Sequence, residues 1–319
     1  MKIARSGSKE QLAPSRQRGL QKALVRQVRP HQWSKNALVL VAPMLAPGLP
    51  DPRLLWRGLL AAFTFSLCAS AGYVLNDLLD IEADRAHPTK KSRPFASGAL
   101  PAALGPPLGL ALMTTSFALA YVFLPRKFLL MLAIYLAGTT CYSLFLKKQI
   151  LIDVLVLAGL YAHRVLSGGV ATEVHVSAWL IGFSIFLFTS LAFCKRYVEL
   201  RDLRSDDQVR NRGYFRTDLQ MVTSMGTASA YVSALVFVLY VDSAAVRSAY
   251  EEPAILWLAL PILLYWLGRI WILAGRGQMH DDPVRFALKD RRSLVCGALI
   301  ACLAALSRFP PAWLTPLLH

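Results

Sequence analysis

The sequence is poor in charged residues, and especially in acidic ones. Charged side chains make up 17% of the 319 residues, with 19 Asp or Glu against 35 Lys or Arg. Hydrophobic residues make up 55%, and the mean hydropathy is +0.44. A water-soluble domain of this size rarely has such a balance. The composition therefore argues against a soluble domain and predicts a membrane protein.

Cysteine is also scarce. The five cysteines all lie in apolar runs and show no Cys-x-x-Cys spacing, so neither a disulfide framework nor a zinc site is expected. The first twenty residues are basic and polar and lack the apolar core of a cleavable signal peptide. We expect residues 1–25 to form a flexible basic cytoplasmic tail. No short repeat or separate polar domain is visible, so residues 26–319 are expected to form a single transmembrane domain.

Long apolar runs dominate the rest of the chain. If about 20 apolar residues make one membrane span, there are nine candidates, of which the first and last are short and the first contains Pro43 and Pro47. We therefore expect an all-α, polytopic bundle of nine transmembrane helices. The candidate spans are residues 36–47, 54–76, 103–124, 128–146, 150–171, 178–194, 218–241, 253–274 and 293–307.

Basic residues are distributed unevenly among the connecting segments. With the N-terminus in the cytoplasm, 27 of the 35 Lys and Arg fall on the cytoplasmic side and 5 on the outer side. This bias follows the positive-inside rule and predicts a cytoplasmic N-terminus. The net charge of +16 suits anionic lipid headgroups. We expect a membrane partner and no nucleic-acid partner.

The segment from Asn76 to Asp84 combines four acids in eight residues after a long apolar run. On a helix Asp77, Asp80 and Asp84 would share one face, whereas Glu82 would point away. Such a face favours a divalent cation, and oxygen ligands suit Mg²⁺, which usually bridges to substrate phosphates. The alternative is a solvated acidic helix end. The neighbouring basic segment favours a metal site with three catalytic aspartates, beside which Asn76 would bind substrate.

That basic segment contains Lys90, Lys91 and Arg93 between Pro88 and Pro94. The two prolines disfavour a continuing helix and hold the cations in a loop, where they can reach phosphate oxygens. The cations could also serve only as a positive-inside anchor. Their position beside the aspartates favours substrate binding.

A second polar segment follows the sixth candidate span. Its first charges lie at the membrane boundary, where a charge needs a functional or structural reason. Beyond Leu200 the mixed charges are typical of a hydrated loop. We expect catalytic roles for Lys195 and Glu199, and substrate-binding roles for Arg196 and Tyr197.

Other polar residues lie within the spans or near their cytoplasmic ends. Asp153 and Arg164 would project from one helix face but stand about 16 Å apart, too far for a direct pair, and a buried Arg usually faces a polar cavity. His280 could act as an acid or base, although a lone His is often only an interfacial residue. The remaining candidate substrate-binding residues are Lys35, Asn36, Tyr142, Lys147, Asp153, Arg164, Arg212, Tyr214, His280, Asp281 and Asp282.

The pattern Asn76-Asp77-x-x-Asp80-x-x-x-Asp84 at the end of the second span, with a polar loop after the sixth, resembles the UbiA superfamily of intramembrane prenyltransferases. The resemblance covers nearly the whole chain. It implies a helical bundle around a central cavity open to the cytoplasmic side. In that cavity Asp-rich motifs would hold Mg²⁺ and a diphosphate.

The second motif departs from the common Asp-x-x-x-Asp cluster and reads Lys195-Arg196-Tyr197-Val198-Glu199. With Arg93-Pro94, Arg212-Gly213-Tyr214 and Asp281-Asp282-Pro283, it is similar to the decaprenyl-phosphate phosphoribosyltransferase branch. This implies Mg²⁺-dependent transfer of 5-phosphoribosyl from phosphoribosyl pyrophosphate to a polyprenyl phosphate in a bacterial inner membrane. One alternative is prenyl transfer from a polyprenyl diphosphate to an aromatic or other small acceptor. Another is a non-enzymatic lipid transporter or scaffold.

Overall fold

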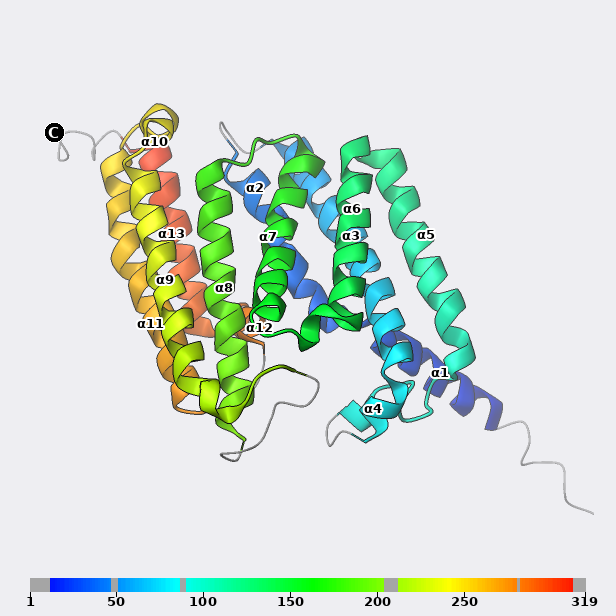
Figure 1. Ribbon diagram of the computed structural model, residues 1–319. Coiled ribbons are helices and arrows are strands. Elements are labelled where there is room, and N and C mark those ends of the chain that lie inside the picture. The colour runs from blue at the N-terminus through cyan, green and yellow to red at the C-terminus, as the bar shows by residue number, and fades with distance from the viewer. Residues whose placement is uncertain (1–11, 47–50, 87–89, 204–211, 280–281, 312–319) are drawn as a thin grey trace, which may run out of the picture.

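The chain folds into a bundle of helices that stand side by side (Figure 1). The computed structural model describes residues 12–46, 51–86, 90–203, 212–279 and 282–311, and these residues contain no β-strand. The α-helices are α1 (Leu12–Val28), α2 (Val41–Met44), α3 (Pro52–Leu79), α4 (Ile81–Arg85), α5 (Gly105–Phe123), α6 (Arg126–Leu144), α7 (Ile152–Thr172), α8 (Ala178–Arg201), α9 (Leu219–Val241), α10 (Ala244–Ala249), α11 (Ala259–Gly275), α12 (Pro283–Ala287) and α13 (Arg291–Arg308). The 3₁₀-helices are η1 (Pro30–Leu40), η2 (Lys90–Ser92), η3 (Ala102–Leu104), η4 (Leu146–Lys148), η5 (Arg216–Asp218) and η6 (Pro253–Leu258).

Within the described residues, seven helical segments are long and apolar enough to cross a membrane. They coincide with seven of the nine expected spans, which confirms the all-helical membrane fold. They are Pro52–Leu79, Ala102–Phe123, Arg126–Leu144, Ile152–Thr172, Ala178–Arg201, Arg216–Val241 and Pro253–Gly275.

The two short candidate spans at the ends of the chain differ from the other seven. The first folds as the 3₁₀-helix η1 followed by the four-residue helix α2. The last forms α13, whose ends carry Arg291, Arg292 and Arg308 and which runs beside α11 (Figure 1). Neither belongs to the seven segments, because η1 and α2 are too short and α13 carries three cations.

The residues before the first span are helical in part. We expected residues 1–25 to form a flexible tail, but α1 begins at Leu12. Ala23 is buried on this helix and packs in one cluster with Val74 of α3. The packed region therefore begins earlier than the expected boundary at residue 26, and residues 1–11 lie outside the described part of the chain.

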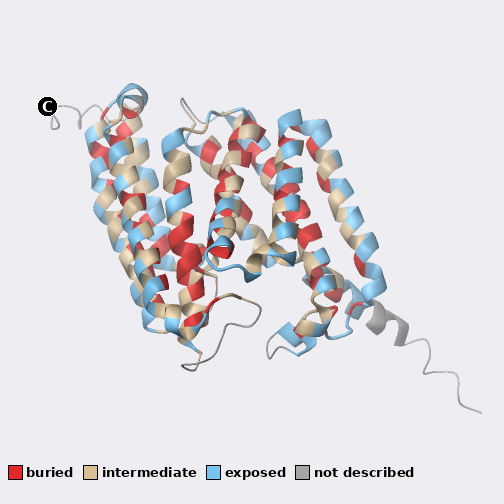
Figure 2. Ribbon diagram, viewed as in Figure 1, coloured by how far each residue is buried: buried red, intermediate tan, exposed pale blue. Residues whose placement is uncertain are grey.

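Helices α3, α7 and α8 form the centre of the bundle. Their apolar stretches are 67%, 56% and 44% buried, compared with 11% and 17% for α5 and α6, so the latter two face outward. Figure 2 shows the same concentration of buried residues on the central helices. The polar residues carried by α3, α7 and α8 are therefore held away from the lipid-facing surface.

Close approach of η1 to α7 depends on a glycine. A Cβ at Gly168 would overlap the backbone carbonyl of Val39, whose side chain is fully buried. Small residues allow helices to approach closely where the hydrophobic effect gives little driving force between them. This contact places Lys35 and Asn36 of η1 beside polar residues of α7.

Replacing this glycine should separate the two elements. We expect Gly168→Ala to destabilise the protein by about 1–3 kcal/mol, because the added methyl group overpacks against backbone. Thermal unfolding in detergent measures the change. Gly159→Ala on the same helix is the matched control, because nothing lies within 4 Å of its added Cβ. Equal melting temperatures for the two variants would contradict this packing.

Candidate active site

Two buried carboxylates near the end of α3 converge on one arginine. The Nη1 atom of Arg93 lies 3.1 Å from Oδ1 of Asp77 and 2.6 Å from Oδ2 of Asp84. Asp77 is 2% exposed and Asp84 is 3% exposed. Buried carboxylates require a positive partner, since burial penalises the charged form. Arg93 therefore occupies a position that is built for a cation.

The expectation that three aspartates share one helical face is wrong. Helix α3 ends at Leu79, and the chain continues through Asp80 into the separate helix α4. Asp80 pairs with Lys147 at 3.3 Å, and its side chain is 38% exposed. Its carboxylate therefore has a different partner from the shared Arg93. Glu82 is exposed, as expected.

Sequence reasoning missed two further partners of Asp77. Arg29 donates to both carboxylate oxygens at 2.6 and 2.7 Å, and Gln27 donates to Oδ2 at 2.8 Å. Arg29 has a positive φ of 57°, which is uncommon for a residue other than glycine and costs about 1–3 kcal/mol. The available sequence signal was a cation immediately before Pro30. The cost of this backbone conformation is offset by a charged contact with a buried carboxylate.

Asp77 and Asp84 fit a magnesium ion by their chemistry. The described residues contain no group of three His, Cys, Asp or Glu side chains that could hold a metal. Mg²⁺, however, is commonly bound by one or two carboxylates together with substrate phosphates and water. Because two carboxylates already converge on one positive group, they supply the number and kind of protein ligands such an ion takes.

The loop after α4 lies near the second polar segment. Burial lowers the pKa of Lys90, and the neighbouring Arg93 lowers it further. Arg212 and Glu199 also affect this pKa, so the charges of the two polar segments are within electrostatic reach of each other. Lys91 is exposed on the same 3₁₀-helix, η2. The structure thus brings the two sequence motifs together.

A second cluster surrounds Asp153 at the start of α7. Its carboxylate is fully buried and pairs with Arg196 Nε at 2.9 Å and with Arg212 Nη1 at 3.6 Å. The Tyr214 hydroxyl donates to it at 2.8 Å. Arg196 also pairs with Glu199, one turn along α8. Four of the predicted substrate-binding residues and one predicted catalytic residue therefore meet in one network.

Arg212 and Lys147 join this second cluster to the acidic segment. Arg212 donates to the Tyr142 hydroxyl at 2.7 Å and to the backbone carbonyl of Lys147 at 3.3 Å. The ammonium group of Lys147 in turn contacts Asp80. The second cluster is therefore linked through Lys147 to Asp80 in the acidic segment.

A third cluster surrounds Asp282. Lys35 lies 3.0 Å and Lys195 3.3 Å from its carboxylate. The Tyr161 hydroxyl, which the sequence reading missed, donates to it at 3.1 Å. Asp282 also caps α12 by accepting from the backbone N–H of Val284. Two lysines meet a single carboxylate here, so the cluster has a net positive charge when both are protonated.

The pKa values of this cluster follow from burial and charge. Burial lowers the pKa of Lys35 to about 8, and the attraction of Asp282 limits the fall. Burial alone would raise the pKa of Asp282, but Lys195 and Lys35 outweigh it and lower that pKa. At neutral pH Asp282 is ionised and Lys35 is mostly protonated. The cluster can therefore attract an anion under physiological conditions.

Arg164 lies deeper, on α7, among aromatic rings. It donates to Asn36 at 3.0 Å and to the Tyr135 hydroxyl at 3.0 Å, and its guanidinium lies 5.1 Å from the centre of the Tyr161 ring. Asn36 is 2% exposed, so it supports Arg164 rather than standing at an open cavity mouth. Asp153 and Arg164 have different partners, as their separation along the helix predicts.

The other predicted site residues have less specific surroundings or cannot be described. Tyr197 packs edge-on against Trp271, with ring centres 5.9 Å apart, in a hydrophobic cluster. Asn76 is half-buried at the end of α3. His280 and Asp281 lie outside the described residues. Tyr197 is therefore placed as a core residue, whereas the flanking Lys195 and Arg196 make polar contacts.

Comparison with known sequences gives one family and several relatives. The UbiA prenyltransferase family matches residues 37–294. An uncharacterized protein of Sinorhizobium fredii is 38% identical over 86% of this chain, and the match spans about half of that protein, 54%. Nodulation protein NoeC of Azorhizobium caulinodans is 35% identical over 84% of this chain and 87% of its own length. Decaprenyl-phosphate phosphoribosyltransferase of Mycobacterium tuberculosis is 33% identical over 90% of this chain and 94% of its own length.

Comparison with solved structures gives the same fold. A UbiA homologue from Archaeoglobus fulgidus, bound to GPP and Mg²⁺, superposes with a TM-score of 0.66 and 13% sequence identity. The match covers 88% of this chain and 98% of that protein. The arrangement of helices is therefore shared, although little of the sequence is.

The charges of the Asp282 cluster predict how the pKa of Lys35 responds to substitution. Replacing Asp282 with Asn should lower the pKa of Lys35 below about 8, by on the order of one pH unit. Burial and the nearby Lys195 remain, while the attraction that favours the charged form is lost. The titration of ¹³C-dimethylated lysine, assigned with Lys35→Arg, measures this pKa by NMR.

The control for this titration is Asp202→Asn, which removes a largely exposed carboxylate paired with Arg201. It should leave the Lys35 midpoint unchanged. A midpoint near 10.5 in the unsubstituted protein, or one that Asp282→Asn does not lower, would contradict the electrostatic account of the cluster.

Proposed function

Because this chain belongs to the UbiA prenyltransferase family, and is therefore an integral membrane transferase, we propose that it transfers 5-phosphoribosyl from phosphoribosyl pyrophosphate to a polyprenyl phosphate. Pyrophosphate is the other product. The observation that carries this proposal is the pair of lysines on one carboxylate, Lys35 and Lys195 on Asp282. This pair would form a second anion-binding site. The first would be the Mg²⁺ ion held by the aspartates near the end of α3.

A second anion site distinguishes the two transferase reactions. Both substrates of phosphoribosyl transfer carry phosphate, so both must be bound by cations. Prenyl transfer to an aromatic or other small acceptor requires a diphosphate site and an acceptor pocket. The 33% identity to the mycobacterial phosphoribosyltransferase supports the former reaction. In the second motif, the basic residues Lys195 and Arg196 support it too.

The donor would bind at the acidic segment. Asp77 and Asp84 would hold Mg²⁺, which when bound would neutralise charge on the departing pyrophosphate. Arg93 can exchange a carboxylate for a phosphate, since a guanidinium presents the same paired N–H groups to both. Lys90 and Lys91 would contact the phosphates from the same loop. Arg29 would hold the Asp77 carboxylate in position through its two hydrogen bonds.

The acceptor would place its phosphate at Lys35 and Lys195. A phosphate oxygen of the lipid would form a bond to C1 of the ribose while the bond from C1 to the pyrophosphate oxygen breaks. A phosphate monoester is already ionised at neutral pH, so the reaction requires no strong general base. The network of Asp153, Arg196 and Arg212 would hold α7, α8 and the following loop in position between the two sites.

Prenyl transfer from a polyprenyl diphosphate to an aromatic or other small acceptor is the second candidate function. The observation that favours it is the fold shared with a homologue bound to GPP and Mg²⁺. A non-enzymatic transporter or scaffold is set aside, because the chain belongs to a family of transferases.

The membrane arrangement belongs to the same proposal. The bias of Lys and Arg supports a cytoplasmic N-terminus in a bacterial inner membrane. Nine membrane-crossing segments would result if η1 with α2 and α13 also enter the bilayer, around a central cavity open to the cytoplasmic side. Both substrates would then reach the site from the cytoplasm and the bilayer.

The test incubates the purified full chain with Mg²⁺ and either of two substrate pairs. One pair is polyprenyl phosphate with labelled phosphoribosyl pyrophosphate, and the other is a prenyl diphosphate with aromatic acids. We expect label to enter the lipid in the first mixture and to be lost on chelation of Mg²⁺. Product formed only in the second mixture would contradict the proposal.

Variants test whether the aspartates act in this reaction. Asp77→Asn and Asp84→Asn should each lower the turnover rate by about 100-fold or more, because charge stabilisation of the leaving group is lost. Glu82→Gln on the exposed side of α4 is the matched control and should retain activity. Full activity in both aspartate variants would remove the metal site from the proposal.

A further inference from the structure

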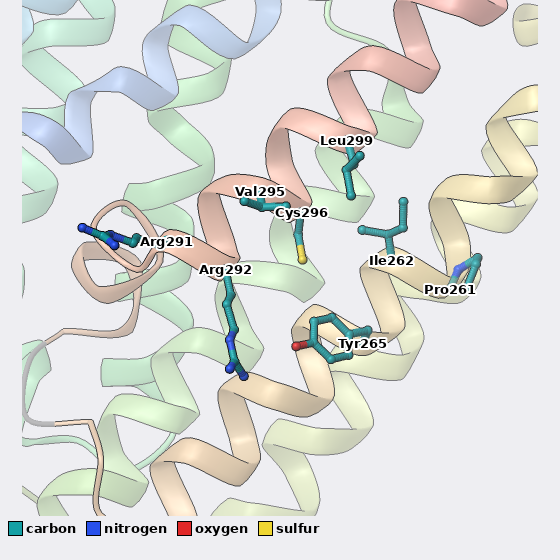
Figure 3. A pocket seen from close by; sticks show the side chains of 8 residues that line it. All are labelled: Pro261, Ile262, Tyr265, Arg291, Arg292, Val295, Cys296 and Leu299. Carbon is teal, nitrogen blue, oxygen red and sulfur yellow. The ribbon is translucent and has the colours of Figure 1, made fainter.

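A groove separate from the three polar clusters lies between α11 and α13. Its volume is about 580 Å³, and Figure 3 shows the residues that line it. Most of its wall is apolar, with the Arg side chains and a phenol as exceptions. The lining residues are Pro261, Ile262 and Tyr265 of α11 and Arg291, Arg292, Val295, Cys296 and Leu299 of α13.

The apolar part of the groove has the character of a hydrocarbon-binding surface. In Figure 3 the side chains of Cys296 and Leu299 face Ile262 across the space between the two helices. The segment Pro253–Gly275, which joins η6 and α11, is long and apolar enough to cross a membrane. The groove therefore follows a membrane-crossing helix, where a lipid chain can lie along it.

Two exposed arginines stand at one end of this groove, where in Figure 3 Arg292 extends toward Tyr265 and Arg291 points away from it. Neither Arg291 nor Arg292 forms an ion pair within the described part of the chain. The adjacent carboxylate of Asp290 pairs with Arg269 instead, through two contacts of 2.6 and 3.0 Å. Asp290 also accepts from the backbone N–H of Ser293 and so caps α13. The positive charge at the groove is therefore not balanced by its neighbours.

The start of α13 lies beside α11 rather than beyond its end. The contact between Asp290 and Arg269 aligns the start of α13 with a point six residues before Gly275, or about 9 Å at the helical rise. A charge is costly where it faces lipid beside a membrane-crossing helix, and arginine side chains extend toward the interface to reduce this cost. An anionic headgroup drawn to the groove would remove it.

We propose that this groove binds an anionic phospholipid of the surrounding membrane, with its phosphate on Arg292 and an acyl chain against Ile262, Cys296 and Leu299. Guanidinium groups bind phosphate through paired hydrogen bonds. The Tyr265 hydroxyl points toward Arg292 in Figure 3 and can donate to the same phosphate. The lipid would bridge α11 and α13 and stabilise their contact.

A thiol introduced by Leu299→Cys reports the occupancy of the groove, because Leu299 is 48% exposed whereas Cys296 is only 6% exposed. The two exposed cysteines, Cys141 and Cys302, are first replaced by Ser, which leaves the buried Cys68, Cys194 and Cys296. The full chain is placed in nanodiscs of phosphatidylcholine, alone or with phosphatidylglycerol of the same acyl chains. Phosphatidylglycerol should slow maleimide modification of the Leu299→Cys thiol several-fold. Equal rates in the two membranes would overturn the proposal.

Charge variants then separate headgroup binding from general membrane effects. Arg291→Gln with Arg292→Gln should abolish the effect of phosphatidylglycerol, whereas Arg276→Gln, an exposed cation at the end of α11, should preserve it. Persistence of the effect in the double variant would overturn the proposal. Ile262→Trp should fill the groove and protect the Leu299→Cys thiol in both membranes, which provides a test that does not depend on the double variant.

Two further additions identify the ligand. Inorganic phosphate or polyprenyl phosphate is added to phosphatidylcholine nanodiscs in separate samples. Neither should match the protection given by phosphatidylglycerol. Protection by polyprenyl phosphate alone would assign the groove to the substrate lipid, and protection by inorganic phosphate alone would assign it to a soluble anion; either result would overturn the proposal.

Discussion

The pairing of two buried carboxylates with one guanidinium is the contact on which the rest of the site depends. Asp77 and Asp84 share Arg93, and Asp77 has a second cation in Arg29. Removing one partner of such a buried pair typically costs about 3–5 kcal/mol. The two arginines therefore fix α1, η1 and the loop after α4 against the end of α3. A positive φ at Arg29 is the backbone cost of this arrangement.

The three polar clusters differ in the balance of cations and carboxylates, and this difference suggests a separate role for each cluster. Two arginines meet two carboxylates around Asp77, and Arg196 and Arg212 meet Asp153 and Glu199. Within the part of the chain that the structure describes, the Asp282 cluster alone of the three has more cations than carboxylates. The first can exchange a guanidinium for a metal, the second holds helices together, and the third has charge left for an anion. The proposed reaction between two phosphorylated substrates would use all three.

The sequence predicted the elements more successfully than the contacts between them. Long apolar runs identified seven membrane helices, because length and hydropathy are local properties. The break at Asp80 was missed, since no proline or glycine marks it. Arg29 and Tyr161 were missed as site residues because their partners lie 48 and 121 positions away in the chain. Which helix faces meet is decided by packing, as at Gly168, and periodicity alone does not reveal it.

The central claim is that Asp77 and Asp84 form a metal and diphosphate site that Arg93 occupies in the structure described. The most direct measurement is the binding of Mn²⁺, which suits the same carboxylate ligands as Mg²⁺. Binding is monitored as the loss of the electron paramagnetic resonance signal of the free ion. Phosphoribosyl pyrophosphate should strengthen binding to the unsubstituted protein. Asp77→Asn combined with Asp84→Asn should abolish that binding, whereas Glu82→Gln should retain it. Unchanged binding in the double variant would contradict the account.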